Sequence, residues 1–194
     1  MSMSVQYRMS QLITERRTIR KFKEDSVSTE LISELLEVAS YAPNHKLKEP
    51  WRFVIFNGKG KEALADLMEN LASKKGAKFK KSPEEIKKHF SSVPAHLVVI
   101  MPEDPQPFLR EEDYAANCAL IQNFQLAAWE RGIGALWKTD SFITLPEFRD
   151  LVGAKPGEKV VAILHIGYPE VIPTVRTRTP IAEKLTVIDK NEVK

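Results

Sequence analysis

The chain has 194 residues and a mass of 22.1 kDa, enough for one domain of ordinary size with a substantial core. Hydrophobic residues make up 43% and charged residues 28%, as in typical globular proteins, which excludes a mainly disordered or fibrous chain. The net charge of +3 is too small for a protein dedicated to the phosphate backbone of nucleic acid, so any positive site is local.

Cysteine usage and hydropathy predict a cytoplasmic protein with no membrane anchor. Cys118 is the only cysteine and cannot form an intrachain disulfide, and the start MSMSVQYRMSQL lacks the apolar core of a signal peptide. The longest segment without a charge, Tyr114–Trp129, is too short to span a bilayer comfortably. The chain has no internal repeat or Gly/Ser linker, so we expect residues 1–194 to form a single domain.

Hydrophobic periodicity and helix-capping residues predict alternating helices and strands in the first half of the chain. The expected elements are a helix from Ser28 to about Ala42, a strand over 51–56 ending at Asn57-Gly58, a helix over 61–73, a lysine-rich helical stretch over 77–89 capped by Ser82, and a buried strand over 96–101. The prolines of PEDPQP, residues 102–107, predict a loop without regular structure.

The second half of the chain contains one long helix and two further strands. The expected elements are a helix over 111–131, a short strand over 135–139, a short helix beginning near Thr144, a strand within 158–169, and an extended arm over 170–194. Four strands spread among several helices predict an α+β sandwich. Tyr114–Trp129 has no charge on any face, which is typical of a helix enclosed all round, partly by a second subunit.

Two basic segments lie at opposite ends of the chain. In an extended Arg16-Arg17-Thr18-Ile19-Arg20, the first, third and fifth side chains project to one side and Arg17 to the other. Such a row suits a phosphate ester, because Arg forms paired charge-assisted hydrogen bonds with phosphate; the alternative is a solvated basic turn. Arg176 and Arg178 either converge on the same anion or form a second exposed loop.

The loop between Pro43 and Pro50 contains two side chains able to hydrogen-bond a heteroaromatic ring or a substrate, Asn44 and His45. His45 is a candidate general acid, and the alternative is an ordinary surface histidine. Trp51, at the start of the following strand, is expected in the core.

The segment from Gly132 to Asp140 joins the long helix to a short strand through two glycines. Glycine permits close approach to a flat ligand, to which Trp137, Lys138 and Thr139 could present backbone donors; otherwise the glycines only terminate the helix. The sequence has no P-loop, dinucleotide fingerprint, nucleophile elbow or zinc motif, so no metal site is expected.

Taken together and in this order, the segments ERRTIRKF, APNHKLKEPWRFVIF, GIGALWKTD, IGYP and RTRTP resemble the FMN-dependent nitroreductase family, in the form of its compact subgroup. The resemblance runs from about Met9 to Glu183. It implies a three-layer α/β/α sandwich with a central, mostly antiparallel sheet, and an intertwined homodimer with FMN at the subunit interface. The arm from about residue 170 would embrace the partner subunit.

The resemblance also assigns roles to individual residues. Arg16, Thr18, Arg176 and Arg178 should surround the FMN phosphate and ribityl chain, with Arg17 beside them. Arg20 matches the cation near the pyrimidine end of the flavin, where it would stabilise the reduced state. The remaining positions are the strand against the ring, Trp137, Lys138 and Thr139, and the residues expected from the other subunit, Pro43, Asn44 and His45.

The activity implied is ping-pong hydride transfer from NADH or NADPH to a small electron-poor acceptor such as a nitroaromatic or a quinone. This reaction requires no protein nucleophile, and His45 is at most a proton donor or a hydrogen-bonding group. Two alternatives remain: the same flavin used for enone reduction, dehalogenation or flavin turnover, and a non-catalytic FMN-binding protein. Nucleic acid is not an expected partner, because the basic groups lack interleaved aromatics.

The chain departs from the family pattern at two positions. Glu49 stands where most members carry Gln before Pro-Trp, and Tyr41 stands where compact relatives can have Arg. The segment after Pro43 also lacks the usual serine, so contacts to the flavin edge are expected to differ. The chain has no insertion long enough for a large lid, which predicts an open pocket.

Overall fold

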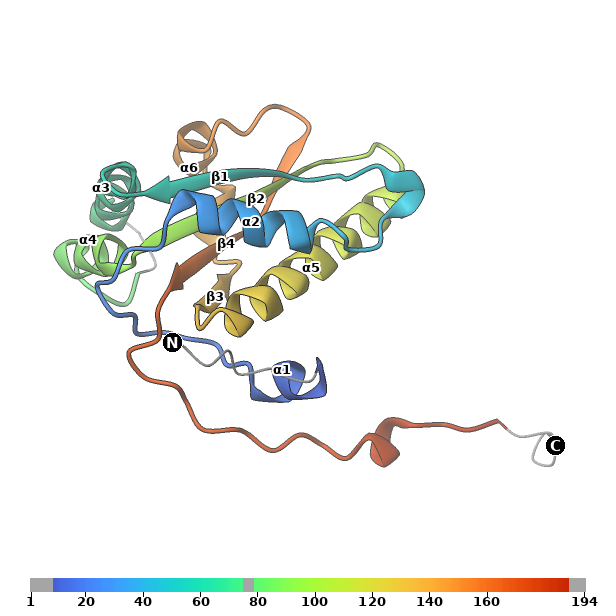
Figure 1. Cartoon of the computed structure of the whole chain (residues 1–194). Coiled ribbons are helices and arrows are strands. Elements are labelled where there is room, and N and C mark those ends of the chain that lie inside the picture. The colour runs from blue at the N-terminus through green and yellow to red at the C-terminus, as the bar shows by residue number, and fades with distance from the viewer. Residues whose placement is uncertain (1–8, 75–78, 189–194) are drawn as a thin grey trace.

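The computed structural model describes residues 9–74 and 79–188, shown in Figure 1. Its elements in chain order are α1 (Met9–Glu15), α2 (Thr29–Ala39), the 3₁₀ turn η1 (His45–Leu47), β1 (Arg52–Asn57), α3 (Gly60–Ser73), α4 (Pro83–Ser92), β2 (Ala95–Pro102), α5 (Pro107–Glu130), β3 (Gly134–Lys138), η2 (Ser141–Thr144), α6 (Pro146–Leu151), β4 (Glu158–Gly167) and η3 (Ile181–Lys184). Residues 1–8, the start of the predicted lysine-rich stretch at 77–78 and the end of the predicted arm at 189–194 lie outside the described residues.

The strands form one sheet in the order β1-β2-β4-β3, and every neighbouring pair is antiparallel. The central pair, β2 and β4, carries a register shift between Val99 and Ile100. An isolated parallel bridge joins Thr18 to Ala135 at the outer edge of β3. The expected mostly antiparallel sheet is therefore confirmed.

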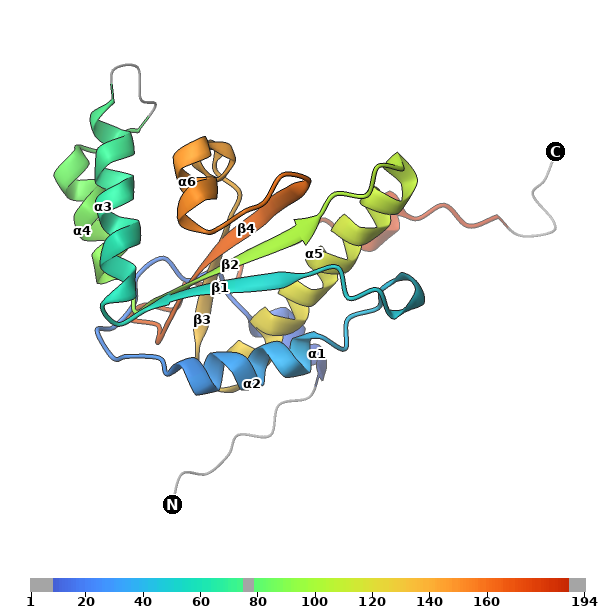
Figure 2. The same cartoon turned by 90° about the horizontal axis from the view of Figure 1, so that it is seen from above.

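Helices cover both faces of the sheet, as the view from above shows (Figure 2). Helices α2 and α5 pack on one face through a cluster of buried apolar side chains, and α3, α4 and α6 pack on the other through a second cluster. Successive residues of β2 serve the two faces alternately, because side chains alternate along a strand: Leu97 and Val99 contact the first cluster, and Val98 and Ile100 the second. The three-layer α/β/α sandwich is confirmed.

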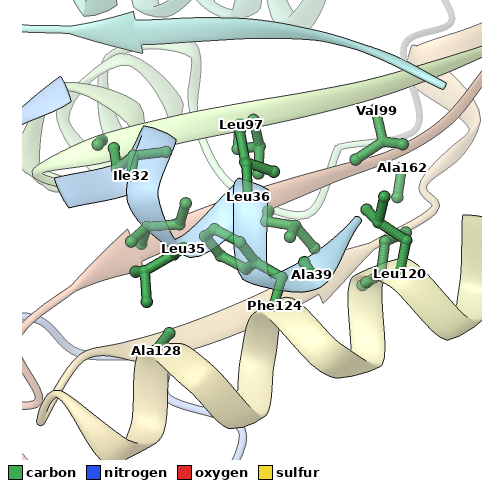
Figure 3. Close-up of a cluster of buried hydrophobic side chains, with 14 of the residues drawn as sticks. Ile32, Leu35, Leu36, Ala39, Leu97, Val99, Leu120, Phe124, Ala128 and Ala162 are labelled. Carbon is green, nitrogen blue, oxygen red and sulfur yellow. The ribbon is translucent and has the colours of Figure 1, made fainter. Parts of the chain in front are cut away.

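In the layer formed by α2 and α5, apolar residues at helical spacing on one helix pack against those on the other (Figure 3). Four buried residues of α2 recur at helical spacing: Ile32, Leu35, Leu36 and Ala39. They meet a row from α5 of the same spacing, Leu120, Phe124 and Ala128, none of which is exposed. Ser28 caps α2 by accepting the Leu31 N–H, as its position before the periodic run predicts.

Three predicted boundaries were wrong. Helix α2 ends at Ala39 instead of near Ala42, because the last residues form a tighter turn, with the Ala42 N–H on the Ala39 carbonyl, ahead of Pro43. Helix α5 begins at Pro107 and not at Glu111, since proline is well suited to a first helical position. Helix α4 runs on to Ser92, and its predicted Ser82 cap is part of a complete capping box with Glu85.

Within the single chain, the uncharged stretch of α5 is enclosed on one side only. Ala116, Leu120 and Phe124 are buried, whereas Ala115 is exposed and Cys118, Ala119, Gln122 and Leu126 are partly exposed. The interpretation that this helix is covered all round is thus not fulfilled by this chain's own residues. None of the helices in the described ranges is long and apolar enough to cross a bilayer.

Candidate functional site

The arginine segment 16–20 is held against the outer edge of β3 by its one apolar residue. Ile19 is fully buried, and its backbone N–H donates to the Ala135 carbonyl at 3.1 Å. Gly134 makes this approach possible, because a Cβ there would lie 2.8 Å from the Cβ of Ile19. The close approach at this glycine is therefore made by Ile19, while Gly132, with φ of 74°, ends α5.

The C-terminal arm returns to the same region because it leaves β4 beside residues 21–23. The Lys23 N–H donates to the Tyr168 carbonyl at 2.9 Å, and the Glu170 N–H donates to the Lys21 carbonyl at 3.1 Å. These bonds bring the beginning of the arm alongside the arginine segment, although the two are about 150 residues apart in the sequence. From there the arm runs past α1 and away from the sheet (Figure 1).

The two basic segments line one cavity of about 650 Å³. Its wall includes six of the residues singled out from the sequence, Arg16, Arg17, Thr18, Arg20, Arg176 and Arg178. Of the two arrangements left open by the sequence, convergence is the one observed. The expectation that segment 16–20 is fully extended holds only in part, because its regular pairing is limited to the bridge at Thr18.

Among the residues that the structure describes, no carboxylate neutralises the positive charge of this cavity. Across residues 9–74 and 79–188, no Asp or Glu forms an ion pair with any of its five arginines. Arg16 donates to Gln125 Oε1 at 3.2 Å, but its buried Nε has no hydrogen-bond partner among the described residues. Burial, and then the charges of Arg17 and Arg178, lower the pKa of Arg16 from its usual value. This arrangement favours an anionic ligand.

A second cavity, of about 1070 Å³, shares Arg20 with the first. Lys138 lines it and pairs with Asp140 at 2.8 Å, and its ammonium group lies 5.7 Å from the centres of the Phe90 and Phe142 rings. Apolar residues such as Phe142 and Leu71 complete the wall.

The strand residues predicted to lie against a ligand have different environments. Trp137 is partly buried against the α2–α5 core, whereas Thr139 is exposed. Because β3 is an edge strand and hydrogen-bonding groups alternate along it, the backbone of Trp137 faces the same outer edge as that of Ala135. Its backbone groups are thus available on the side where the arginine segment lies.

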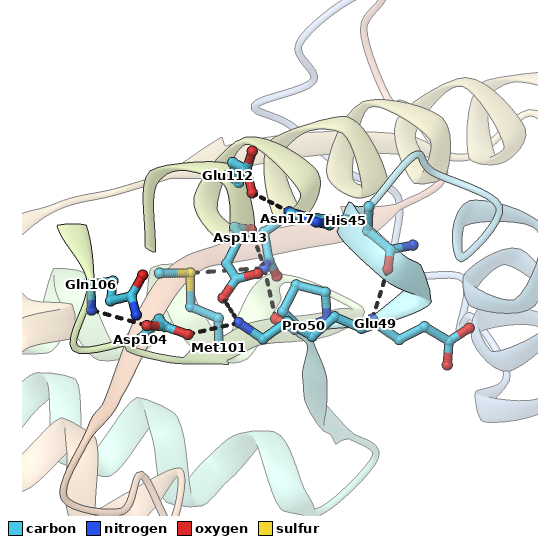
Figure 4. Close-up of polar contacts among 11 residues, drawn as sticks. His45, Glu49, Pro50, Met101, Asp104, Gln106, Glu112, Asp113 and Asn117 are labelled. Carbon is cyan, nitrogen blue, oxygen red and sulfur yellow. Dashed lines mark hydrogen bonds and ion pairs between the residues drawn. The ribbon is translucent and has the colours of Figure 1, made fainter. Parts of the chain in front are cut away.

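The loop around η1 is apart from both cavities, since neither wall includes Pro43, Asn44 or His45. Asn44 uses its carboxamide within the loop, accepting the Glu49 N–H at 2.8 Å and donating to the Ala42 carbonyl at 3.2 Å. His45 Nδ1 lies 2.6 Å from Glu112 Oε2 on α5 (Figure 4). In one chain, therefore, these three residues do not join the arginines.

Several polar residues that hold this loop were not found from the sequence. Lys48 pairs with Asp113 at 2.6 Å and with Asp104 at 3.1 Å, and Asn117 donates to the Pro50 carbonyl at 2.8 Å. Helix α5 and its leading loop supply all three partners. No local spacing rule links them to a loop more than 50 residues earlier, so only the acidic start of α5 could have suggested a partner for Lys48.

Both departures from the family pattern are on the surface of this chain. The Glu49 side chain is exposed, and Figure 4 shows it directed away from the polar contacts. Tyr41 is 90% exposed. Neither side chain contributes to the two cavities described above.

Comparison with known proteins gives a consistent result. The family model described as “Nitroreductase family” matches residues 13–168. The Bacillus subtilis protein named “Putative NAD(P)H nitroreductase YfhC” is 38% identical over 177 residues, covering 90% of this chain and 91% of that protein. The crystal structure of a nitroreductase-like family protein from Bacillus cereus is 41% identical, covers 97% of this chain and 100% of that chain, and has a TM-score of 0.88.

A more distant structure shares the fold. The FMN-dependent nitroreductase NfnB from Mycobacterium smegmatis, solved in complex with NADPH, is 16% identical with a TM-score of 0.71 and covers 93% of this chain and 97% of that chain.

Proposed function

Because the chain belongs to the nitroreductase family, we propose that it is an FMN-dependent oxidoreductase that takes hydride from NADH or NADPH and delivers it to nitroaromatics, quinones or similar electron-poor acceptors. The observation that carries the proposal is the cavity with five arginines that no carboxylate of the described residues neutralises. FMN has a doubly charged phosphate at one end and a flat ring at the other, which suits two cavities that have Arg20 in both of their walls.

The residues at the first cavity would hold the phosphate. Arg16 offers a buried, unpartnered Nε, and Arg176 and Arg178 approach from the arm; Arg17 and Thr18 complete the wall. A phosphate oxygen would satisfy the Arg16 N–H, whose burial without a partner otherwise costs free energy. These features support the assignment of the phosphate to this end.

At the other end, the chain would orient the ring and stabilise charge. Bound FMN supplies the hydride chemistry. Arg20 lines both cavities, and its guanidinium would stabilise negative charge at the pyrimidine end. The outward backbone of Trp137, with Lys138 and Thr139, would form the strand against the ring.

We further propose that the site is completed by a second copy of the chain. The described arm, residues 171–188, is exposed throughout, and its apolar side chains range from 54% to 81% exposed: Val171, Ile172, Val175, Ile181, Leu185, Val187 and Ile188. An arm with so many uncovered apolar residues, together with the partly exposed uncharged side of α5, fits an intertwined homodimer. Pro43, Asn44 and His45 would then reach the FMN from the second subunit.

The cellular location of the enzyme is inferred from its proposed hydride donors. NADH and NADPH are available in the reducing cytoplasm, where we expect the enzyme to work.

An absorbance spectrum before and after anaerobic addition of NADPH or NADH tests the function. We expect a yellow protein whose flavin bands bleach and then recover when a nitroaromatic or quinone is added. A flavin that binds but does not bleach would favour the non-catalytic alternative, and a preparation that stays colourless after incubation with FMN would refute the proposal.

Replacing Arg16 and Arg178 together by Ala tests the phosphate assignment. We expect the double variant to lose FMN during purification, measured as the ratio of flavin to protein absorbance. Replacing the exposed Lys59 and Lys88 by Ala removes the same charge away from the cavity and should leave flavin occupancy unchanged. Equal occupancy in the two double variants would exclude the assignment.

Light scattering over a dilution series, combined with flavin absorbance, tests the shared site. The flavin is expected to dissociate as the dimer dissociates. A stable yellow monomer would contradict a site shared between two subunits.

A further inference from the structure

The loop that carries His45 has a strained backbone. Lys46, Leu47 and Glu49 adopt φ values of 54°, 52° and 47°, in the left-handed region that residues other than glycine rarely occupy. Leu47 is 82% exposed, so burial of its side chain does not offset the cost. A conformation of this kind persists only where surrounding contacts impose it, and such strain is often found at functional sites.

Polar contacts fix the loop on both sides of its strained residues. Lys48 is anchored by Asp113, which is only 3% exposed, and by Asp104. The Asn44 carboxamide holds the Glu49 N–H, and the buried Asn117 holds the Pro50 carbonyl. The position of His45 relative to α5 is therefore set by the fold and not by chance contacts on the surface.

The contact between His45 and Glu112 determines which ring nitrogen is free. A carboxylate oxygen only accepts, so the Nδ1 that lies 2.6 Å from Glu112 Oε2 carries the proton and donates it. In the described part of the chain, Nε2 of His45 has no hydrogen-bond partner. Donation through one ring nitrogen fixes both the ring orientation and the tautomer, leaving Nε2 to act on a ligand.

We propose that Glu112 is a positioning residue, which holds His45 as the Nδ1–H tautomer and directs its Nε2 to the electron acceptor. The proposal rests on the proposed function, in which His45 reaches the FMN held mainly by the other subunit. Reduction of a nitro to a nitroso group takes up one hydride and one proton and releases one water. The hydride comes from the reduced cofactor, and the proton from Nε2–H of the imidazolium, which becomes the neutral ring that Glu112 holds.

Side-chain ¹⁵N NMR of the FMN-loaded protein, at a pH where the ring is neutral, measures the tautomer directly. His45→Gln identifies the signals. We expect Nδ1–H in the wild type and in Glu112→Gln, whose amide oxygen still accepts, and a shift to Nε2–H in Glu112→Ala. The control is Glu111→Ala, which removes the same charge from the adjacent, exposed position and should behave as the wild type. An Nε2–H ring in the wild type, or no change in Glu112→Ala, would overturn the proposal.

Half-reaction kinetics separate this proposal from the proposed function. Bleaching by NADPH should be the same in the wild type, in both Glu112 variants and in Glu111→Ala, while reoxidation by a nitroaromatic slows by roughly tenfold in Glu112→Ala, because a well-placed proton donor contributes about 100-fold or more. Glu112→Gln should recover most of the rate. Absence of bleaching in the wild type would refute the function while leaving the tautomer result valid, and equal reoxidation in Glu112→Ala and Glu111→Ala would overturn the role of Glu112.

Discussion

Acidification is expected to destabilise the protein through two buried histidines at the centre of the sheet. His96 on β2 and His165 on β4 are fully buried, and their Nδ1 atoms lie 2.7 Å apart. His96 Nε2 donates to the Phe90 carbonyl at 2.9 Å, so its Nδ1 accepts from His165. His165 Nε2 is then a buried acceptor to which no group in the described ranges donates. Both rings are accommodated in the neutral form.

The magnitude follows from the difference between folded and unfolded chains. Burial lowers the pKa of His96 from 6.5 to about 4, and burial together with His96, Lys138 and His89 lowers the pKa of His165 well below 6.5. The stabilisation from the neutral rings is therefore complete above pH 6.5 and is lost as the pH falls towards 4. For His96 the loss amounts to about 3 kcal/mol, a large part of the roughly 5–15 kcal/mol that stabilises a typical protein.

Urea unfolding at pH 7.5 and pH 4.5, on the wild type and on His165→Leu, measures this effect. The variant leaves His96 Nδ1 unpaired in place of His165 Nε2, so the number of unpaired buried nitrogens does not change. The wild type should lose clearly more free energy of unfolding than the variant between these pH values, because His165 titrates only in the wild type, whereas His96 and His89, whose pKa burial also lowers, titrate in both. Equal losses would refute the reasoning.

The carboxylates whose pKa is lowered in the folded chain lose their stabilising effect mainly below this pH range: Glu84, Asp104, Glu147 and Glu158. Arg52 lowers the pKa of Glu158 to about 2, so the stabilisation from this pair is present above pH 4.5 and is lost only below it. The histidine effect is therefore measurable before the main acid transition.

Three further predictions concern the fold and the segment that carries the arginines. Gly134→Ala should displace Ile19, with a loss of about 1–3 kcal/mol of unfolding free energy in urea and weaker FMN retention, whereas Gly60→Ala, with nothing within 4 Å of the added Cβ, should be nearly neutral. Ser82→Ala removes half of a capping box, and thermal unfolding should show a loss of about 1 kcal/mol; an unchanged melting temperature would contradict the capping role. Phe124→Ala should cost about 3–5 kcal/mol in urea unfolding, and a loss below 1 kcal/mol would mean that α5 packs differently.

The parts of the fold that sequence predicts well are those governed by local patterns. The strand over 51–56 and the helix over 61–73 were placed almost correctly, because period and turn residues determine both. Ser82 was identified as a cap from the three residues that follow it. The errors occurred at helix ends. Helix α2 stops ahead of Pro43 and helix α5 begins at Pro107, so each boundary depends on a single proline.

Convergence of the two basic segments was not decidable from sequence. It depends on Ile19 bonding to β3 and on Glu170 bonding to Lys21, two contacts between residues far apart in the chain. Arg-x-Arg alternation is the same in a solvated loop as in a phosphate site, since both require only exposure. The structure distinguishes them because carboxylates are absent from the cavity wall within the described residues.

The loop at 44–49 was harder still, because its conformation contradicts local preference. Left-handed residues are normally signalled by Gly or Asn, yet here they are Lys46, Leu47 and Glu49. Each such residue costs about 1–3 kcal/mol, so the sequence alone favours a different loop. The actual conformation is imposed by side chains of α5 that lie more than 60 residues away, Glu112, Asp113 and Asn117. This loop costs folding free energy and is nonetheless held by five separate polar contacts, which supports a functional reason for the position of His45.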